Sequence, residues 1–238
     1  MRDFAVITSI VLVFSLCLFI AINNIEKNVY SAVSELSNKD YIVILDAGHG
    51  GEDGGAVAYD GTCEKDINLE FTKNISLYFD LLGIEYIEIR TSDISVGDTS
   101  LETIRSRKNS DIFKRYDIIN SFDNSILLSI HQNMFSVEKY CGTQVFYADS
   151  VADSKIIADC IQKSVSLNLQ PDNNRKIKSS SENIYLLFKA KRPSVMVECG
   201  FMSNFNELSL LKTYEYRSQM SYFIVKGILG YFNQKKVV

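Results

Sequence analysis

Short runs of apolar residues alternate along the chain with segments of helical periodicity. The short runs, rich in β-branched side chains, predict buried strands, and they lie at 41–45, 84–89, 125–130, 143–147 and 194–197. Apolar residues recur every three or four positions in segments 65–82 and 154–167, which predicts a helix in each. The segment 207–232 predicts two helices, and the charged segment 100–116 predicts a surface helix. Residues 170–182 are polar and predict a loop. This alternation predicts an α/β fold with a twisted, largely parallel β-sheet and helices on both faces.

The N-terminal segment differs from the rest because it is apolar on every side. From Phe4 to Ile22 only Thr8, Ser9, Ser15 and Cys17 interrupt the apolar run, which is about long enough to cross a bilayer as a helix. A buried helix of the domain is the alternative, but uniform apolarity at the N-terminus favours export. We therefore predict a signal peptide or membrane anchor at 1–24, a linker at 25–40 and one catalytic domain at 41–236, outside the cytoplasm and either membrane-anchored or secreted.

Composition narrows the class of protein. Hydrophobic residues make up 46% and charged residues 23% of the 238 residues, which is typical of a folded domain. The net charge is -4, and the Lys and Arg residues form no basic stripe, so nucleic acid is excluded as a partner. The cysteines show no C-x-x-C spacing, and we expect free thiols at Cys63, Cys141, Cys160 and Cys199.

The chain has only two histidines, and both follow predicted strands. His49 and His131, together with Asp46 and Glu198, lie at or just past the carboxyl ends of strands, where such sheets bind ligands. Zinc binds imidazole nitrogen and carboxylate oxygen, and a catalytic site uses three protein ligands and leaves one position open. Two histidines therefore require a carboxylate, and spacing alone leaves five candidates: Asp46, Glu52, Asp53, Glu64 and Glu198.

The glycine-rich loop after the first strand has a competing interpretation as a phosphate-binding loop. The G-x-G-x-x-G pattern breaks at Asp53 or Glu52, depending on which glycine begins it. The G-x-x-x-x-G spacing from Gly50 to Gly55 is followed by Ala and Val instead of Lys and Ser or Thr. The sequence therefore disfavours nucleotide binding.

Four separated motifs carry a resemblance to a known family. They are ILDAGHGGEDGG at 44–55, EKDIN at 64–68, SIHQN at 129–133 and ECGFMSN at 198–204. In this order and spacing they resemble the signature blocks of zinc-dependent N-acetylmuramoyl-L-alanine amidases, over about residues 41–233. The SIHQN form, the short length and the absence of a wall-binding repeat are most similar to the sporulation-specific spore-cortex branch, the CwlD type.

The resemblance implies specific roles for residues of this chain. It implies Zn²⁺ as the cofactor, His49, Glu64 and His131 as its ligands, and Glu198 as the catalytic carboxylate. The substrate would be peptidoglycan, cut at the amide between N-acetylmuramic acid and L-alanine, and in the cortex branch this cut prepares muramic-δ-lactam. The corresponding location would be the forespore intermembrane space. A non-catalytic wall-binding protein on the same fold, or another zinc hydrolase such as a sugar deacetylase or phosphoesterase, is the alternative.

Further residues are candidates for supporting roles. Ligating histidines usually donate their second ring nitrogen to a carboxylate or carbonyl, and Asp46 and Asn133 are near enough in sequence to do this. Basic side chains that could meet stem-peptide carboxylates are Arg105, Arg107, Arg175 and Lys178. Because one long loop carries two of the three ligands, we also predict that an activating protein partner could order the zinc site.

Overall fold

The computed structural model describes residues 14–15, 19 and 41–236. Six strands and six helices alternate over residues 42–236: β1 (Ile42–Ala47), α2 (Glu64–Leu82), β2 (Tyr86–Glu88), α3 (Ile104–Asn120), β3 (Ser125–Asn133), β4 (Gln144–Tyr147), α4 (Ala152–Asn168), β5 (Lys178–Ser179), α5 (Tyr185–Phe188), β6 (Ser194–Phe201), α6 (Phe205–Leu211) and α7 (Tyr214–Lys236).

The six strands form one sheet in the order β2-β1-β3-β6-β4-β5. All neighbouring pairs are parallel except β4 and β6, which are antiparallel. This confirms the predicted largely parallel sheet. The long buried strands β1, β3 and β6 lie in the middle, so the side chains at their carboxyl ends are brought to a common edge.

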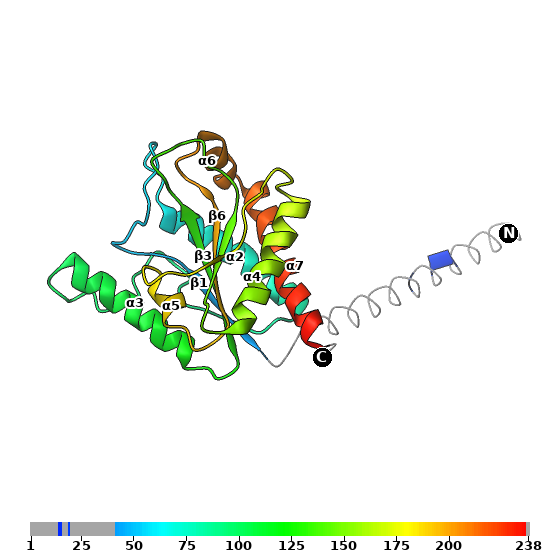
Figure 1. Cartoon of the computed structure of the whole chain (residues 1–238), viewed down its shortest axis with the longest axis horizontal. Coiled ribbons are helices and arrows are strands. Elements are labelled where there is room, and N and C mark those ends of the chain that lie inside the picture. Colours follow the sequence, from blue (N-terminus) through cyan, green and yellow to red (C-terminus); the bar gives the residue numbers. More distant parts are fainter. Residues whose placement is uncertain (1–13, 16–18, 20–40, 237–238) are drawn as a thin grey trace, which may run out of the picture.

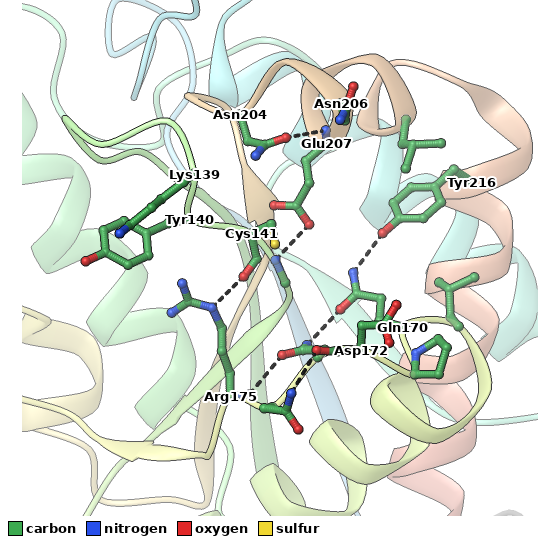
Figure 2. Close-up of a pocket in the computed structure, with 16 residues that line it drawn as sticks. Lys139, Tyr140, Cys141, Gln170, Asp172, Arg175, Asn204, Asn206, Glu207 and Tyr216 are labelled. Atoms are coloured by element: carbon green, nitrogen blue, oxygen red, sulfur yellow. Dashed lines mark hydrogen bonds between the residues drawn. The ribbon is translucent and has the colours of Figure 1, made fainter.

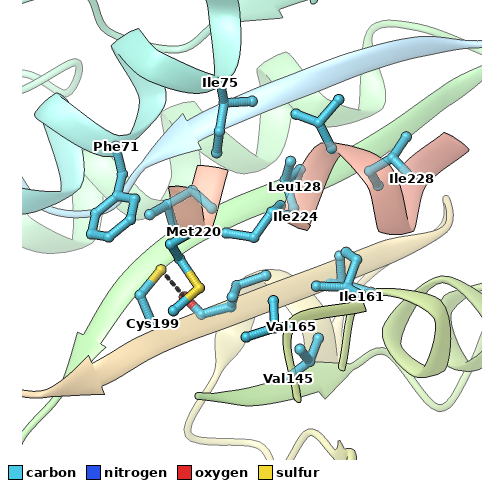
Figure 3. Packing of buried hydrophobic residues seen from close by; sticks show 14 of the residues in the cluster. Phe71, Ile75, Leu128, Val145, Ile161, Val165, Cys199, Met220, Ile224 and Ile228 are labelled. Atoms are coloured by element: carbon cyan, nitrogen blue, oxygen red, sulfur yellow. Dashed lines mark hydrogen bonds between the residues drawn. The ribbon is translucent and has the colours of Figure 1, made fainter. Parts of the chain in front are cut away.

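Helices cover both faces of the sheet, as predicted (Figure 1). One face packs against α2, α4 and α7, whose buried side chains include Phe71, Ile161 and Ile224 (Figure 3). The other face is covered by α3 and α5, through Ile119 and Leu187. Since successive side chains of a strand point to opposite faces, each core strand contributes to both clusters.

Two strands run farther than the apolar pattern predicted. The prediction ended them at His131 and Glu198, but β3 continues to Asn133 and β6 to Phe201. The apolar runs end at the first polar side chain, whereas backbone pairing between the two strands continues and includes these two residues as partners. His131 and Glu198 therefore belong to the strands themselves, and backbone pairing between β3 and β6 fixes their positions relative to each other.

Other differences concern element ends. Helix α3 begins at Ile104 instead of position 100, because Thr103 and Ser106 form a capping box there, and it continues to Asn120. The predicted loop 170–182 contains the two-residue strand β5, and the short helix α5 was not predicted. Helix α2 ends at Leu82, and Gly83 after it adopts the left-handed conformation expected of a C-cap glycine.

The predicted signal or anchor at 1–24, apart from three residues, and the predicted linker at 25–40 lie outside the described residues. A search of the described part of the chain finds no helix with the length and apolarity needed to span a bilayer. The four predicted free thiols are confirmed, and they range from the buried Cys199 to the exposed Cys141.

Candidate metal centre

His49 lies in the loop between β1 and α2, in an unusual backbone conformation. Its φ of 63° makes it the only described non-glycine residue with positive φ, a conformation that costs free energy and persists where the surroundings enforce it. Two buried arginines supply that enforcement. Arg90 donates from Nε to the Ala47 carbonyl at 2.8 Å and from Nη2 to the Gly48 carbonyl at 3.1 Å, and Arg115 Nη2 donates to the His49 carbonyl at 2.6 Å.

Glu64 is the first residue of α2 and is 4% exposed. Its carboxylate accepts hydrogen bonds from the backbone N–H groups of Ala56 at 2.9 Å and Gln132 at 3.0 Å. It also contacts both histidines, at 3.2 Å to His49 Nε2 and 2.9 Å to His131 Nδ1. Burial alone would raise its pKa, but the two histidines hold the pKa of Glu64 far below its ordinary value. Glu64 is therefore a charged carboxylate fixed between two imidazoles.

These three side chains form the one group of metal-binding residues found in the described part of the chain. One potential ligand atom each from His49, Glu64 and His131 lies within 4.8 Å of the other two. Glycines provide the space that the group needs: a Cβ on Gly48 would come within 2.1 Å of His131 Nε2, and a Cβ on Gly55 within 2.6 Å of Glu64 Oε2. Two imidazoles and a carboxylate form a donor set that suits zinc.

The second ring nitrogen of His49 is held by Asp53. His49 Nδ1 and Asp53 Oδ2 are 2.7 Å apart, and Lys108 Nζ lies 2.7 Å from the other oxygen of that carboxylate. Burial lowers the pKa of His49, but Asp53 and Glu64 together raise it to about 9. The protonated ring donates from Nδ1 to Asp53 and faces Glu64 with Nε2, and loss of the Nε2 proton would leave a lone pair there for a metal while Asp53 keeps the ring in place.

Glu198 stands beside His131 on the neighbouring strand. The two residues are register partners between β3 and β6, so their side chains share one face of the sheet. Glu198 Oε2 is buried and has no hydrogen-bond partner among the described residues. Burial, together with the nearby charge of Glu64, raises the pKa of Glu198 to about 7 although both histidines act to lower it. A carboxylate with this pKa can both take up and release a proton near neutral pH.

A cavity of about 280 Å³ opens beside the two histidines. It lies between the sheet and helices α3 and α5, and its apolar wall includes Ile112, Tyr185 and Met196. Glu198 does not line it. Both histidines line this cavity, together with Met196 of the strand that carries Glu198.

The predicted supporting residues lie apart from the histidine nitrogens. Asp46 is buried against Arg115 and accepts a hydrogen bond from Ser129 at 2.7 Å, and it forms no hydrogen bond with either histidine. No hydrogen bond of the Asn133 side chain is seen, although its carbonyl accepts from Met202. Arg107 binds Glu52 at the surface at 2.8 Å, and Arg105 is exposed. The structure brings the four main candidates together. Asp46 lines the same cavity as the two histidines, whereas Asn133, Arg105 and Arg107 do not line it.

Several residues of the site were not predicted. Asp53 was considered only as a ligand, although its position four residues after His49 in the same loop was an available signal. Arg115 was part of the predicted surface helix, yet it is 3% exposed. Asn68 is completely buried and donates to the Gly48 carbonyl at 3.1 Å and to Glu64 Oε1 at 3.3 Å. The position of Asn68 one helical turn after Glu64 was the only sequence signal for that role.

Residues 43–230 match the family model described as N-acetylmuramoyl-L-alanine amidase. The chain belongs to this amidase family. The germination-specific N-acetylmuramoyl-L-alanine amidase of Bacillus subtilis (strain 168) is 35% identical over 194 residues, which cover 82% of this chain and 81% of that protein.

Solved amidase structures agree. The CwlD amidase from Clostridioides difficile, solved in complex with the GerS lipoprotein, superposes with a TM-score of 0.78 and 38% identity, covering 81% of this chain and 98% of that chain. An N-acetylmuramoyl-L-alanine amidase from Clostridium difficile 630 gives a TM-score of 0.69 at 25% identity, covering 82% and 98%.

These findings confirm the predicted enzyme class and fold. The chain is an amidase of the N-acetylmuramoyl-L-alanine amidase family, with a germination-specific relative, and its substrate class is peptidoglycan. The His49, Glu64 and His131 group is a possible metal site of the kind that zinc-dependent members of this family need.

Proposed function

We propose that the amidase hydrolyses the amide bond between N-acetylmuramic acid and L-alanine with zinc held by His49, Glu64 and His131 and with Glu198 as general base and acid. The supporting observation is the convergence of the three donor side chains within 4.8 Å, beside the half-buried Glu198 carboxylate on the adjacent strand. The three donors come from the loop after β1, the first turn of α2 and the end of β3, and Glu198 comes from β6.

The residues fit a catalytic zinc site. Two imidazole nitrogens and one carboxylate oxygen are a known donor set for hydrolytic zinc, and three protein ligands leave a position for water or substrate. The space that Gly48 and Gly55 leave around His131 and Glu64 would be filled by any larger residue. Bound zinc supplies a Lewis acid that polarises the scissile carbonyl and lowers the pKa of water from about 15.7 towards 7.

The protein's own groups then handle the proton. Glu198 in its charged form accepts a proton from the attacking water, and its buried Oε2 is free to do so because no described residue donates to it. The protonated Glu198 passes this proton to the nitrogen of L-alanine as the C–N bond breaks, since an unprotonated amine is a poor leaving group. Asp53 keeps His49 oriented through both half-reactions.

Replacing Glu198 with Gln tests this assignment. We expect kcat for a muramyl peptide to fall by about 10² to 10⁴ because proton transfer is lost. Zinc content should stay unchanged, because Glu198 is not one of the three ligands. The melting temperature should change little, because Gln keeps the size of the side chain and Glu198 Oε2 has no hydrogen bond to lose. A replacement of His131 by Ala provides the contrasting case, in which zinc is lost together with activity.

Product analysis separates this proposal from another zinc hydrolase. The wild-type amidase should release peptides that begin with L-alanine and leave a free lactyl group on muramic acid. Release of acetate with intact amide bonds would instead support a sugar deacetylase, and full activity of the Glu198→Gln variant would refute the role of Glu198. Wall binding without cleavage would support the non-catalytic alternative.

The biological setting is a second part of the proposal. The germination-specific relative supports a role in spore-cortex muramic-δ-lactam formation, with the catalytic domain in the forespore intermembrane space and residues 1–24 as its export signal or membrane anchor. Cortex muropeptides from a strain that lacks the gene should contain no δ-lactam. Unchanged δ-lactam content would refute this setting without affecting the amidase reaction itself.

We also propose a protein partner that promotes zinc binding, since the Clostridioides difficile CwlD amidase was solved in complex with the GerS lipoprotein. The loop that carries His49 depends on a positive-φ backbone and on two arginine side chains, so a partner that stabilises this loop would raise zinc affinity. Zinc titration of the purified domain tests this idea. Stoichiometric, tight zinc binding by the domain alone would refute it.

A further inference from the structure

Arg175 lies in the segment between α4 and β5, and its side chain is held in one orientation. Its Nε donates to the Cys141 carbonyl at 2.7 Å, and its Nη1 donates to Gln144 Oε1 at 3.3 Å. The guanidinium carbon is 4.4 Å from the ring centroid of Phe201, which is stacking distance. These contacts fix the plane of the guanidinium group before any ligand arrives.

The positive charge of Arg175 has no carboxylate partner. Among the residues that the structure describes, none forms an ion pair with it. Glu207 is close enough to interact electrostatically, but its two oxygens accept the backbone N–H groups of Gly142 and Phe201, each at 2.8 Å. Asp172 lines the same cavity and makes no ion pair with Arg175 either. Arg175 therefore has a fixed orientation and an unneutralised positive charge, which suits a side chain that binds an anionic ligand.

Arg175 lines a cavity of about 700 Å³. Figure 2 shows its guanidinium on the side of this cavity that carries Tyr140 and Lys139. The guanidinium carbon lies 5.9 Å from the Tyr140 ring, and Lys139 Nζ lies 5.9 Å from the same ring. The cavity therefore offers two cations next to aromatic and aliphatic surface, which suits an anionic peptide.

A register path connects Arg175 to the metal centre. His131 on β3 pairs with Glu198 on β6, and Glu198 pairs with Gln144 on β4. Neighbouring strands are about 4.8 Å apart, so the path from His131 to Gln144 covers about 10 Å. An extended peptide advances about 3.4 Å per residue, so two or three residues span this path.

The position of Glu198 sets the direction in which the substrate lies. Under the proposed function, Glu198 protonates the leaving nitrogen, so the peptide side of the scissile amide lies towards Glu198. Gln144 and Arg175 are beyond Glu198 on that side. The cavity beside Tyr185 is lined by both histidines but not by Gln144 or Arg175, and it would receive the glycan.

We propose that Arg175 is a specificity-determining residue that binds the free carboxylate of the second residue of the stem peptide. This inference rests on the proposed function, because it takes the scissile amide to lie between the metal centre and Glu198. The planar guanidinium and a carboxylate form charge-assisted hydrogen bonds, which are stronger than neutral ones. The enzyme therefore distinguishes stem peptides with an acidic second residue from those in which that carboxylate is amidated.

The test uses two muramyl tripeptides that differ only in whether the second residue carries a free carboxylate or the corresponding amide. The zinc-loaded full chain should cleave the acidic substrate with a kcat/KM roughly 10- to 100-fold higher, mainly through KM, because a hydrogen bond between two charged groups is lost on amidation. This comparison needs no variant, so it holds even where a substitution impairs folding.

Variants then assign the effect to Arg175. Arg175→Ala should raise KM for the acidic substrate by roughly 10- to 100-fold and change the amidated one by less than about threefold. Arg175→Lys should restore part of the preference, since it keeps the charge but loses the planar geometry. Arg192→Ala is the matched control: Arg192 pairs with Asp123 at 2.7 Å at the surface and should affect neither substrate.

Two results would overturn the inference. One is equal cleavage of both tripeptides by the wild-type enzyme, and the other is an equal loss on both substrates in Arg175→Ala. In either case cleavage of the muramyl amide itself would still support the proposed function. Failure to cleave either substrate with zinc bound would instead refute the proposed function.

Discussion

Gly48 leaves the space that His131 occupies, and replacing it with Ala would test the metal centre directly. The added Cβ would lie 2.1 Å from Nε2, 2.2 Å from Cε1 and 2.7 Å from Cδ2 of the His131 ring. Ordinary contacts of this kind are at least about 3.5 Å, so the ring must move by more than about 1 Å. The φ of Gly48 is not in the left-handed region, so the substitution acts through this clash.

The size of the effect follows from the displaced ring. A shift of about 1 Å in a catalytic group costs on the order of 10² in rate, and here the same shift disturbs the 2.9 Å contact between His131 Nδ1 and Glu64 Oε1. We therefore expect kcat/KM to fall by at least about 10² and zinc affinity to fall with it. Overpacking of this kind costs about 1–3 kcal/mol of stability, which corresponds to a melting temperature lower by about 2–12 °C.

Zinc titration, muramyl peptide hydrolysis and thermal unfolding of the same preparations would measure these effects. Gly54→Ala is the matched control in the same loop, because its Cβ would meet Cys63 Sγ at 3.6 Å, an ordinary contact. The control should keep wild-type zinc affinity and activity. If Gly48→Ala also kept both, His131 would not need its present position, and our account of the metal centre would be wrong.

Three further predictions concern the surroundings of the site. Asp53→Ala should lower zinc affinity by about 10- to 100-fold because His49 loses the group that orients it, whereas Glu52→Gln at the surface should leave zinc affinity unchanged. Equal zinc affinities of the two variants would contradict this role of Asp53. Glu198 acts as a base, and burial raises its pKa to about 7, so kcat/KM should fall about tenfold per pH unit on the acid side of the pKa of Glu198; bound zinc would lower this pKa. A pH profile of kcat/KM that stays flat down to about pH 4 would contradict the role of Glu198. Arg115→Met removes the ion-pair partner of the buried Asp46 carboxylate and should lower the free energy of unfolding by about 3–5 kcal/mol, whereas Arg107→Met should change it little because the ion pair of Arg107 with Glu52 is exposed. Similar denaturant midpoints for the two variants would show that the buried pair is not needed.

The periodicity of the sequence was sufficient for the fold and for the position of the site. Apolar runs that end in polar residues predicted the strands β1, β3 and β6 and the convergence of His49, His131 and Glu198 at one sheet edge. These predictions depend on local patterns and on the general rule that parallel strands gather their carboxyl ends. The true ends of β3 and β6 were missed because backbone pairing does not stop where apolar side chains do.

The side-chain contacts that complete the site could not be predicted from the sequence. Spacing left five acids as the third ligand, and the contact of Glu64 with both histidines depends on how the loop folds back onto the first turn of α2. Asp53, not Asp46, reaches His49, because Gly50 and Asp53 exchange two backbone hydrogen bonds and so fold the loop back beside the histidine. The burial of Arg115 follows from its pairing with Asp46, which is 69 residues away in the chain, and no local pattern indicates such a partner.

The pairing of His131 with Glu198 links catalysis to the cooperative unfolding of the protein. Both residues belong to the central β3–β6 pair of strands. A shift of either strand by one residue in this pairing would turn its side chain to the opposite face of the sheet. We expect the backbone amides of this ladder to exchange hydrogen slowly, with the free energy of global unfolding, while those of the edge strands β2 and β5 exchange through local opening. Fraying at the rim of the sheet would then leave the catalytic alignment intact until the whole domain unfolds.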